Sequence, residues 1–134
     1  MIDRLSHATV YVLDQERAKT FYTEKLGLEL REDTTLGNFR WITVGPRGQP
    51  DLELVLMPLS TGPLQGEAGD AMRQLVQSGR LGMGVLATRD CRKTYAELKA
   101  RGVTFKSEPA ERPYGIEAML VDDSGNLFSL TERR

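Results

Sequence analysis

The first part of the chain combines short apolar runs with one helical pattern. Residues 5–13 (LSHATVYVL) are rich in β-branched and apolar types, and this run predicts a buried strand. An apolar stripe at helical spacing follows, with Asp14 placed to cap the helix and Gly27 placed to end it. Three shorter strands are then predicted over residues 28–31, 39–44 and 51–57. The predicted order is therefore strand, helix, strand, strand, strand.

The second part of the chain repeats that order after a connection. Residues 58–81 are interrupted by Pro and Gly and carry only a short helical pattern, so we expect them to connect elements and not to form core. Beyond them the sequence predicts a strand over 82–88 and a helix that Asp90 caps and Gly102 ends. The last three strands are predicted over residues 103–106, 115–121 and 127–131.

The spacing of corresponding positions indicates an internal repeat. The two helix caps, Asp14 and Asp90, are separated by a sequence offset of 76, and the same offset separates Tyr22 from Leu98 on the inward stripes of the two helices. For the glycines that end the helices the offset is 75. A constant offset through two units of the same element order is typical of a duplicated module. Two unrelated halves that share an element order are the alternative.

Each half is too small to bury a full core alone, so the two halves are expected to pack together. We therefore predict one domain over residues 1–134. Module one occupies about residues 1–57, a linker about 58–80, and module two about 81–134.

Composition narrows the class of partner. The chain is 40% apolar and 28% charged, an ordinary globular balance. Its net charge of -1 argues against a sequence-blind nucleic-acid binder, which needs a clustered basic surface. No apolar run approaches the roughly 18 residues of a membrane-spanning helix, and the N-terminus lacks the layout of a secretory signal. We expect neither a nucleic-acid partner nor a membrane partner.

Single copies of cysteine and histidine restrict the chemistry further. Cys91 has no second cysteine with which to form an internal disulfide, so a cytoplasmic location is the simplest expectation. His7 is the one histidine. A zinc motif with two histidines, or a facial triad of two histidines and one carboxylate, therefore cannot be built from a single chain.

Several runs resemble the glyoxalase, bleomycin-resistance and extradiol-dioxygenase superfamily, also called vicinal oxygen chelate proteins. The runs are the early strand with His7, AKTFYTEKLGLEL after Asp14, YAELKARGV in the second half, and the closing VDDSGNLFSLTE. The resemblance covers essentially the whole chain. It implies an α+β fold in which two βαβββ modules curl mixed sheets into half-open troughs around a cavity. It also implies that the modules often pair across a homodimer.

The resemblance also implies where metal ligands would lie. Metal-dependent members carry one ligand on the first strand and one on the last strand of each module, which places His7 and Glu53 in module one. Their counterparts at the offset of 76 are Met83 and Ser129, neither of which is a strong metal ligand. Glu117 is a conceivable third ligand, although its spacing does not require it. We therefore expect no complete metal site and no cofactor, with His7 and Glu53 as the ligands if a divalent metal does bind.

His7 and Glu53 are the first candidates for a binding site. Glu53 shares its strand face with apolar residues, and a carboxylate there is costly unless it is paired or ligated. The pair either holds a ligand across the trough or is a structural hydrogen bond left from an ancestral site. Trp41, with Glu117 at the equivalent position of module two, would suit a flat, polar-edged or cationic ligand, although a lone Trp is more often core. Met83 and Ser129 complete the predicted ligand-binding set.

Three functions remain open from the sequence. The protein is a small-molecule binder of the bleomycin-resistance type, a metal-dependent lyase, isomerase or dioxygenase of the glyoxalase type, or a metal-free enzyme that uses Glu53 and His7 as acid or base. The missing ligands in module two favour binding over metal catalysis. Whether the protein is an enzyme, and which organic ligand it takes, stay open.

Overall fold

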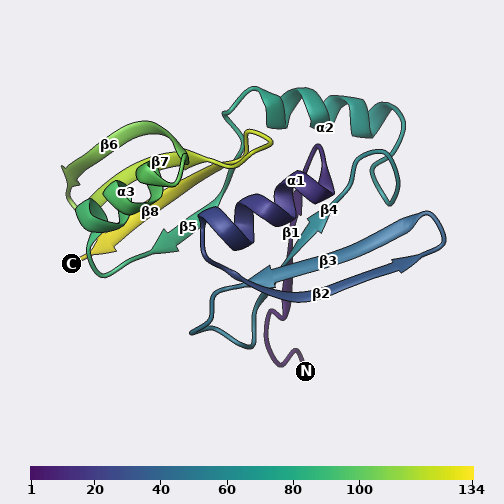
Figure 1. Cartoon of the computed structure of the whole chain (residues 1–134), viewed down its shortest axis with the longest axis horizontal. Helices are drawn as coiled ribbons and strands as arrows, with labels where there is room; N and C mark the ends of the chain where they lie inside the picture. The colour runs from purple at the N-terminus through teal and green to yellow at the C-terminus, as the bar shows by residue number, and fades with distance from the viewer.

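The computed structural model describes all residues, 1–134, and contains two four-stranded mixed sheets. In module one the strands are β1 (His7–Tyr11), β2 (Glu29–Leu36), β3 (Phe39–Gly45) and β4 (Glu53–Met57). In module two they are β5 (Gly82–Ala87), β6 (Thr104–Arg112), β7 (Gly115–Val121) and β8 (Leu127–Arg133). Figure 1 shows the sheets side by side, with the helix of the connection above module one. No helix of the protein has the length and apolar character needed to cross a bilayer.

The two sheets have the same topology. Their strand orders are β1-β4-β3-β2 and β5-β8-β7-β6. In each sheet the first strand pairs in parallel with the last strand, and the other pairs are antiparallel. The α+β class and the two βαβββ modules predicted from the sequence are confirmed. Neither sheet closes on itself.

The two module helices begin and end as the sequence predicts. Helix α1 (Gln15–Thr20) continues as the π-helical turn η1 (Phe21–Lys25), and helix α3 (Cys91–Ala100) is its counterpart. The Asp14 carboxylate accepts the Arg17 N–H at 3.0 Å, and the Asp90 carboxylate accepts the Lys93 N–H at 3.0 Å. Gly27 and Gly102 follow the helices at φ 74° and 92°, the left-handed region that glycine enters without steric cost.

Two strands are longer than their sequence indicated. The strand predicted at 28–31 is β2, which reaches Leu36, and the strand predicted at 103–106 is β6, which reaches Arg112. Both extensions are mainly polar and contain no buried residue, so they lack the apolar signal of a strand. The connection holds helix α2 (Glu67–Gln77), and Val76 of that helix is fully buried. The connection therefore contributes a side chain to the interior, contrary to expectation.

The core lies on the helix-facing side of both sheets and is continuous between them. Its members alternate along the strands: Val10, Val12, Ile42, Val44, Leu56, Ala118, Leu120, Phe128 and Leu130, together with Phe21, Tyr22, Cys91 and Leu98 from the helices. Tyr22 of module one contacts Phe128 of module two edge to face, with ring centroids 6.4 Å apart. The modules therefore pack through their apolar faces, and the opposite face of each sheet, here called its trough face, is left open.

The register of the first and last strands corrects two predicted equivalences, that of Glu53 with Ser129 and that of His7 with Met83. Val55 of β4 stands opposite Thr9 and Thr43, whereas Ser129 of β8 stands opposite Val85 and Met119. These two pairs of neighbours keep the offset of 76, so Ser129 corresponds to Val55, at an offset of 74. The counterpart of Glu53 is Leu127, whose ladder partner is Gly82, so Gly82 stands at the position of His7 and Met83 lies in the irregularity beside it. The offset differs because residues 46–52 of module one form a longer connection than residues 122–126 of module two.

Candidate functional site

The trough face of module one carries a group of polar side chains at one level of the sheet. His7 stands directly opposite Glu53 in the parallel β1–β4 ladder, so their side chains project from the same face. Thr43 of β3 lies on that face as well, opposite Val55. Register alone therefore brings together the histidine and the glutamate that the sequence predicts as a pair.

His7 and Glu53 face one another, and each is oriented by a neighbouring hydroxyl. His7 Nε2 lies 3.8 Å from Glu53 Oε2, and the two side chains are 37% and 22% exposed. The Thr43 hydroxyl donates to Glu53 Oε1 at 2.6 Å, which leaves Oε2 turned toward the histidine. His7 Nδ1 shares a hydrogen bond of 2.9 Å with the Ser6 hydroxyl. His7 therefore keeps Nε2, and Glu53 keeps Oε2, without a hydrogen-bond partner.

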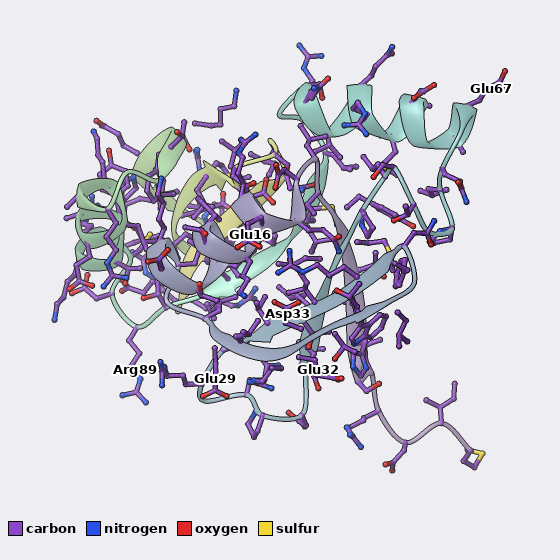
Figure 2. The ribbon with its side chains drawn as sticks, turned by 45° about the vertical axis from the view of Figure 1, so that its right-hand side comes forward. Glu16, Glu29, Glu32, Asp33, Glu67 and Arg89 are labelled. Carbon is purple, nitrogen blue, oxygen red and sulfur yellow. The ribbon has the colours of Figure 1, made fainter.

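A third polar side chain, Glu32, joins this pair because of an irregularity in β2. Leu30 pairs with Val44 and Glu32 pairs with Thr43, so Arg31 is an extra residue in the ladder. Without that bulge, Glu32 would stand opposite Ile42 and point toward the core side. With it, Glu32 projects from the trough face and its neighbour Asp33 from the other, as Figure 2 shows.

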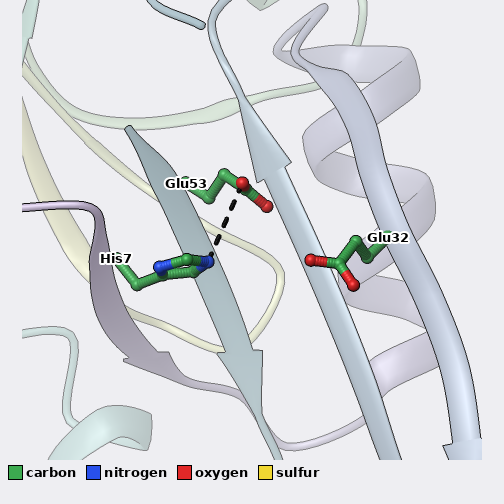
Figure 3. A group of neighbouring side chains, drawn as sticks. All are labelled: His7, Glu32 and Glu53. Carbon is green, nitrogen blue, oxygen red and sulfur yellow. Dashed lines mark ion pairs between the residues drawn. The ribbon is translucent and has the colours of Figure 1, made fainter. Parts of the chain in front are cut away.

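Ligand atoms of His7, Glu32 and Glu53 all lie within 4.8 Å of one another. Figure 3 shows the three side chains converging from three strands, with the His7–Glu53 pair dashed. Imidazole and carboxylate donors at this separation fit a divalent transition metal better than they fit Ca²⁺ or Mg²⁺, which prefer all-oxygen sites. Three protein donors meet the usual number for an open metal site. The prediction that only two donors are available did not include Glu32.

Trp41 lies beside this group. Its ring centroid is 5.9 Å from that of His7, at an interplanar angle of 50°. The side chain is half-buried and projects from the trough face, since Trp41 and Thr43 are two residues apart on β3. The lone tryptophan thus places a flat apolar surface next to the polar group and is not a member of the core.

The trough face of module two has a different polar centre. Glu117 of β7 accepts the Tyr114 hydroxyl and the Ser129 hydroxyl, each at 2.6 Å. Arg112 Nε lies 4.0 Å from the same carboxylate. The Ser129 hydrogen bond, followed by that of Tyr114, lowers the pKa of Glu117. Ser129 also bonds Thr131 at 2.5 Å.

Five of the six predicted ligand-binding residues fall into two sets. His7, Glu53 and Trp41 lie together in module one, whereas Glu117 and Ser129 are bonded to each other in module two. Met83 packs against the core, next to a ladder irregularity between Gly82 and Gly84. Glu117 is not part of the His7 group, where Glu32 is the third donor.

Two cavities lie elsewhere in the chain. One of about 690 Å³ is lined by Leu26 and Leu28 after η1, by residues of β5 and α3, and by the loop with Gly48 and Gln49. Another of about 490 Å³ lies beside α1 and the turn with Asp122 and Asp123. Neither is lined by His7, Glu32 or Glu53.

Comparison with known protein families identifies the class to which this protein belongs. Residues 4–130 match the family model for the glyoxalase/bleomycin resistance protein/dioxygenase superfamily. The chain belongs to this superfamily, as its sequence resemblance predicts.

Similar proteins span the whole chain. The uncharacterized protein YurT of Bacillus subtilis (strain 168) is 36% identical over 93% of this chain and 95% of its own length. The crystal structure of UcmS2 has a TM-score of 0.93 at 49% identity, covering 98% of this chain and 99% of that one. TnmS3, described as an antibiotic binding protein from Streptomyces sp. CB03234, has a TM-score of 0.79 at 32% identity, covering 99% and 98% of the two chains.

Proposed function

We propose that the protein binds a small organic ligand on the trough face of module one. The observation that carries the proposal is the juxtaposition of His7, Glu53 and Trp41, which offers hydrogen-bonding groups beside an aromatic surface. The description of TnmS3 as an antibiotic binding protein supports the same class of function. Glu32 and Glu53 add negative charge, so a flat ligand with a cationic or hydrogen-donating edge fits best.

A second copy of the chain would complete the binding site. The trough faces are open in the single chain, and Val85 on the trough face of module two is 64% exposed. Small domains tend to cover such surfaces by association. We therefore propose a homodimer with two-fold symmetry that encloses both trough faces, which would add Glu117 and Ser129 to the ligand's surroundings. Sedimentation of a monomer at micromolar concentrations contradicts the dimer.

Trp41 supplies the test of ligand binding, because it is the single tryptophan and lies at the proposed site. Titration with bleomycin and a set of flat aromatic antibiotics should change its fluorescence in a saturable way for at least one compound. Trp41→Phe should weaken binding of that compound when measured by calorimetry. Saturable binding that leaves Trp41 fluorescence unchanged places the ligand elsewhere.

Glu53→Gln separates binding from a structural role. The change keeps the shape and removes the charge. Under the proposal, ligand affinity falls by about 1–3 kcal/mol, the usual cost of one charged hydrogen bond, with little change in the free energy of unfolding. A loss of stability with unchanged affinity instead shows that the His7–Glu53 pair is structural.

A metal-dependent lyase, isomerase or dioxygenase is the second candidate function. The observation that favours it is Glu32, which raises the number of metal donors in module one to three. A bound ion would act as a Lewis acid at this position, and Trp41 would border the substrate.

A cytoplasmic location stays a prediction that rests on the unpaired Cys91.

A further inference from the structure

The three donors His7, Glu32 and Glu53 all belong to module one, on the first, second and last strands of one sheet. The family pattern used in the sequence analysis draws ligands from the first and last strands of both modules. Here the corresponding pair of module two is Gly82 and Leu127, with Met83 in the irregularity beside Gly82, and none of these is a suitable donor for a divalent cation. The bulge at Arg31 brings in a donor from a strand that contributes none in that pattern.

The surroundings of two of the donors are those of oriented metal ligands. Ligating histidines commonly donate from the second ring nitrogen, and ligating carboxylates are themselves hydrogen-bonded. When Nδ1–H of His7 donates to the Ser6 hydroxyl, the lone pair of Nε2 is directed at the group. The Thr43 hydroxyl occupies Oε1 of Glu53 and leaves Oε2 available. The chain thus holds one free ligand atom on each of these residues.

The charge of the group is not balanced by side-chain cations. Glu53 has one ion-pair partner, His7, and Glu32 has none. Two arginines on the neighbouring strands β2 and β3 are paired elsewhere. Arg31 pairs with Glu29 and donates to backbone carbonyls of the loop after β3, and Arg40 pairs with Asp33 and Glu16. Two adjacent carboxylates without a basic partner repel each other, and a divalent cation removes that repulsion.

We propose that His7, Glu32 and Glu53 form a divalent transition-metal site contained in module one. One imidazole and two carboxylates suit Mn²⁺, Co²⁺, Ni²⁺ and Zn²⁺, and affinity should rise from Mn²⁺ through Co²⁺ to Ni²⁺. Three protein ligands leave coordination positions for water or for the organic ligand of the proposed function. The inference concerns ion binding itself and does not depend on which organic ligand is bound.

Metal analysis of untagged protein tests the site. The protein is stripped with chelator, dialysed against each ion, and its metal content is measured by mass spectrometry alongside calorimetric titration. We expect one ion per chain for the wild type, and Glu32→Gln should weaken binding by about 10- to 100-fold or more. The matched control is Glu108→Gln, which changes an exposed glutamate on β6, the corresponding strand of module two. It should bind as the wild type does.

The outcomes separate this inference from the proposed function. Failure of the wild type to retain any of the four ions overturns the metal site, and so does wild-type affinity in Glu32→Gln. Thermal unfolding of each stripped variant checks that a loss of binding is not a loss of fold. Binding of an organic compound is measured on the same stripped protein through Trp41, so either proposal can fail while the other stands.

Discussion

The trough faces of the two modules have the same strand topology but differ in how their carboxylates are partnered. In module one, the carboxylates of Glu32 and Glu53 converge with His7 and have no arginine or lysine partner. In module two, the carboxylate of Glu117 is bound by Ser129 and Tyr114, with Arg112 at 4.0 Å. In module one, Glu53 Oε2 accepts no hydrogen bond, whereas both carboxylate oxygens of Glu117 in module two accept one.

This difference arises from the side chains at corresponding positions and from a shift of the last strand, not from a change of fold. An extra residue at the same place in β2 and β6 turns Glu32 to the trough face in module one and Ser107 in module two. A longer β3–β4 connection shifts β4 by two positions relative to β8. A shift of two keeps each side chain on its face and moves it along the strand. The duplicated sheet can therefore carry a ligand-binding group in one copy and a structural network in the other.

The connections before β4 and β8 also differ in the hydrogen bonds that hold them. In module two, the buried Asp122 carboxylate accepts from the hydroxyl of Tyr22 at 2.6 Å and from four N–H groups of Ser124, Gly125 and Asn126. Asn126 Nδ2 also donates to the Tyr11 carbonyl at 2.8 Å. This turn therefore ties module two to module one. The loop of module one is held mainly by the Arg31 guanidinium, which donates to three backbone carbonyls.

The largest predicted effect is on the free energy of unfolding and compares the two connections before the last strands. Asp122→Ala should lower the free energy of unfolding by about 3–5 kcal/mol, because it leaves several buried donors without an acceptor. Arg31→Ala should cost about 1–2 kcal/mol, since most of the freed carbonyls regain water. Urea unfolding of both variants measures the difference. An equal or larger loss for Arg31→Ala would break the contrast between the two connections.

The second prediction concerns Asp123 in the same turn. Burial, and then the neighbouring Asp122, raise the pKa of Asp123 from 3.8 to about 6. A raised pKa means that the native state takes up a proton more readily than the unfolded chain. The stability contribution of the protonated form is therefore present in acid and is lost as pH rises through about 6.

Asp123→Asn should accordingly increase the free energy of unfolding at neutral pH. We expect a gain of about 1–2 kcal/mol, reduced because the side chain is only partly buried, and fading toward pH about 4. The matched control is Asp51→Asn in the exposed connection of module one, which should give no such gain. Denaturant unfolding at several pH values makes the comparison. A gain that is constant with pH would mean that ionisation of Asp123 is not its cause.

The sequence predicts the scaffold better than it predicts the site, for reasons that particular residues make clear. The caps Asp14 and Asp90 and the stop glycines are local signals, and the structure confirms them. His7 and Glu53 follow from strand alternation and from the family resemblance. Glu32 could not, because simple alternation from Leu30 places it on the core side and only the bulge reverses its direction.

The smallest predicted effect distinguishes the two hydroxyl-to-carboxylate bonds. Ser129→Ala removes the bond that chiefly lowers the pKa of Glu117, and this should cost about 0.5–1.5 kcal/mol at neutral pH. A lowered pKa stabilises the fold above the ordinary value of 4.5, so the cost should shrink as pH falls below it. Ion affinity should not change.

Thr43→Val removes the corresponding bond to Glu53, and it should weaken ion binding by about tenfold while changing stability little. Calorimetric ion titration and urea unfolding of both variants test this division. If Ser129→Ala weakens ion binding as much as Thr43→Val does, the metal group is not confined to module one.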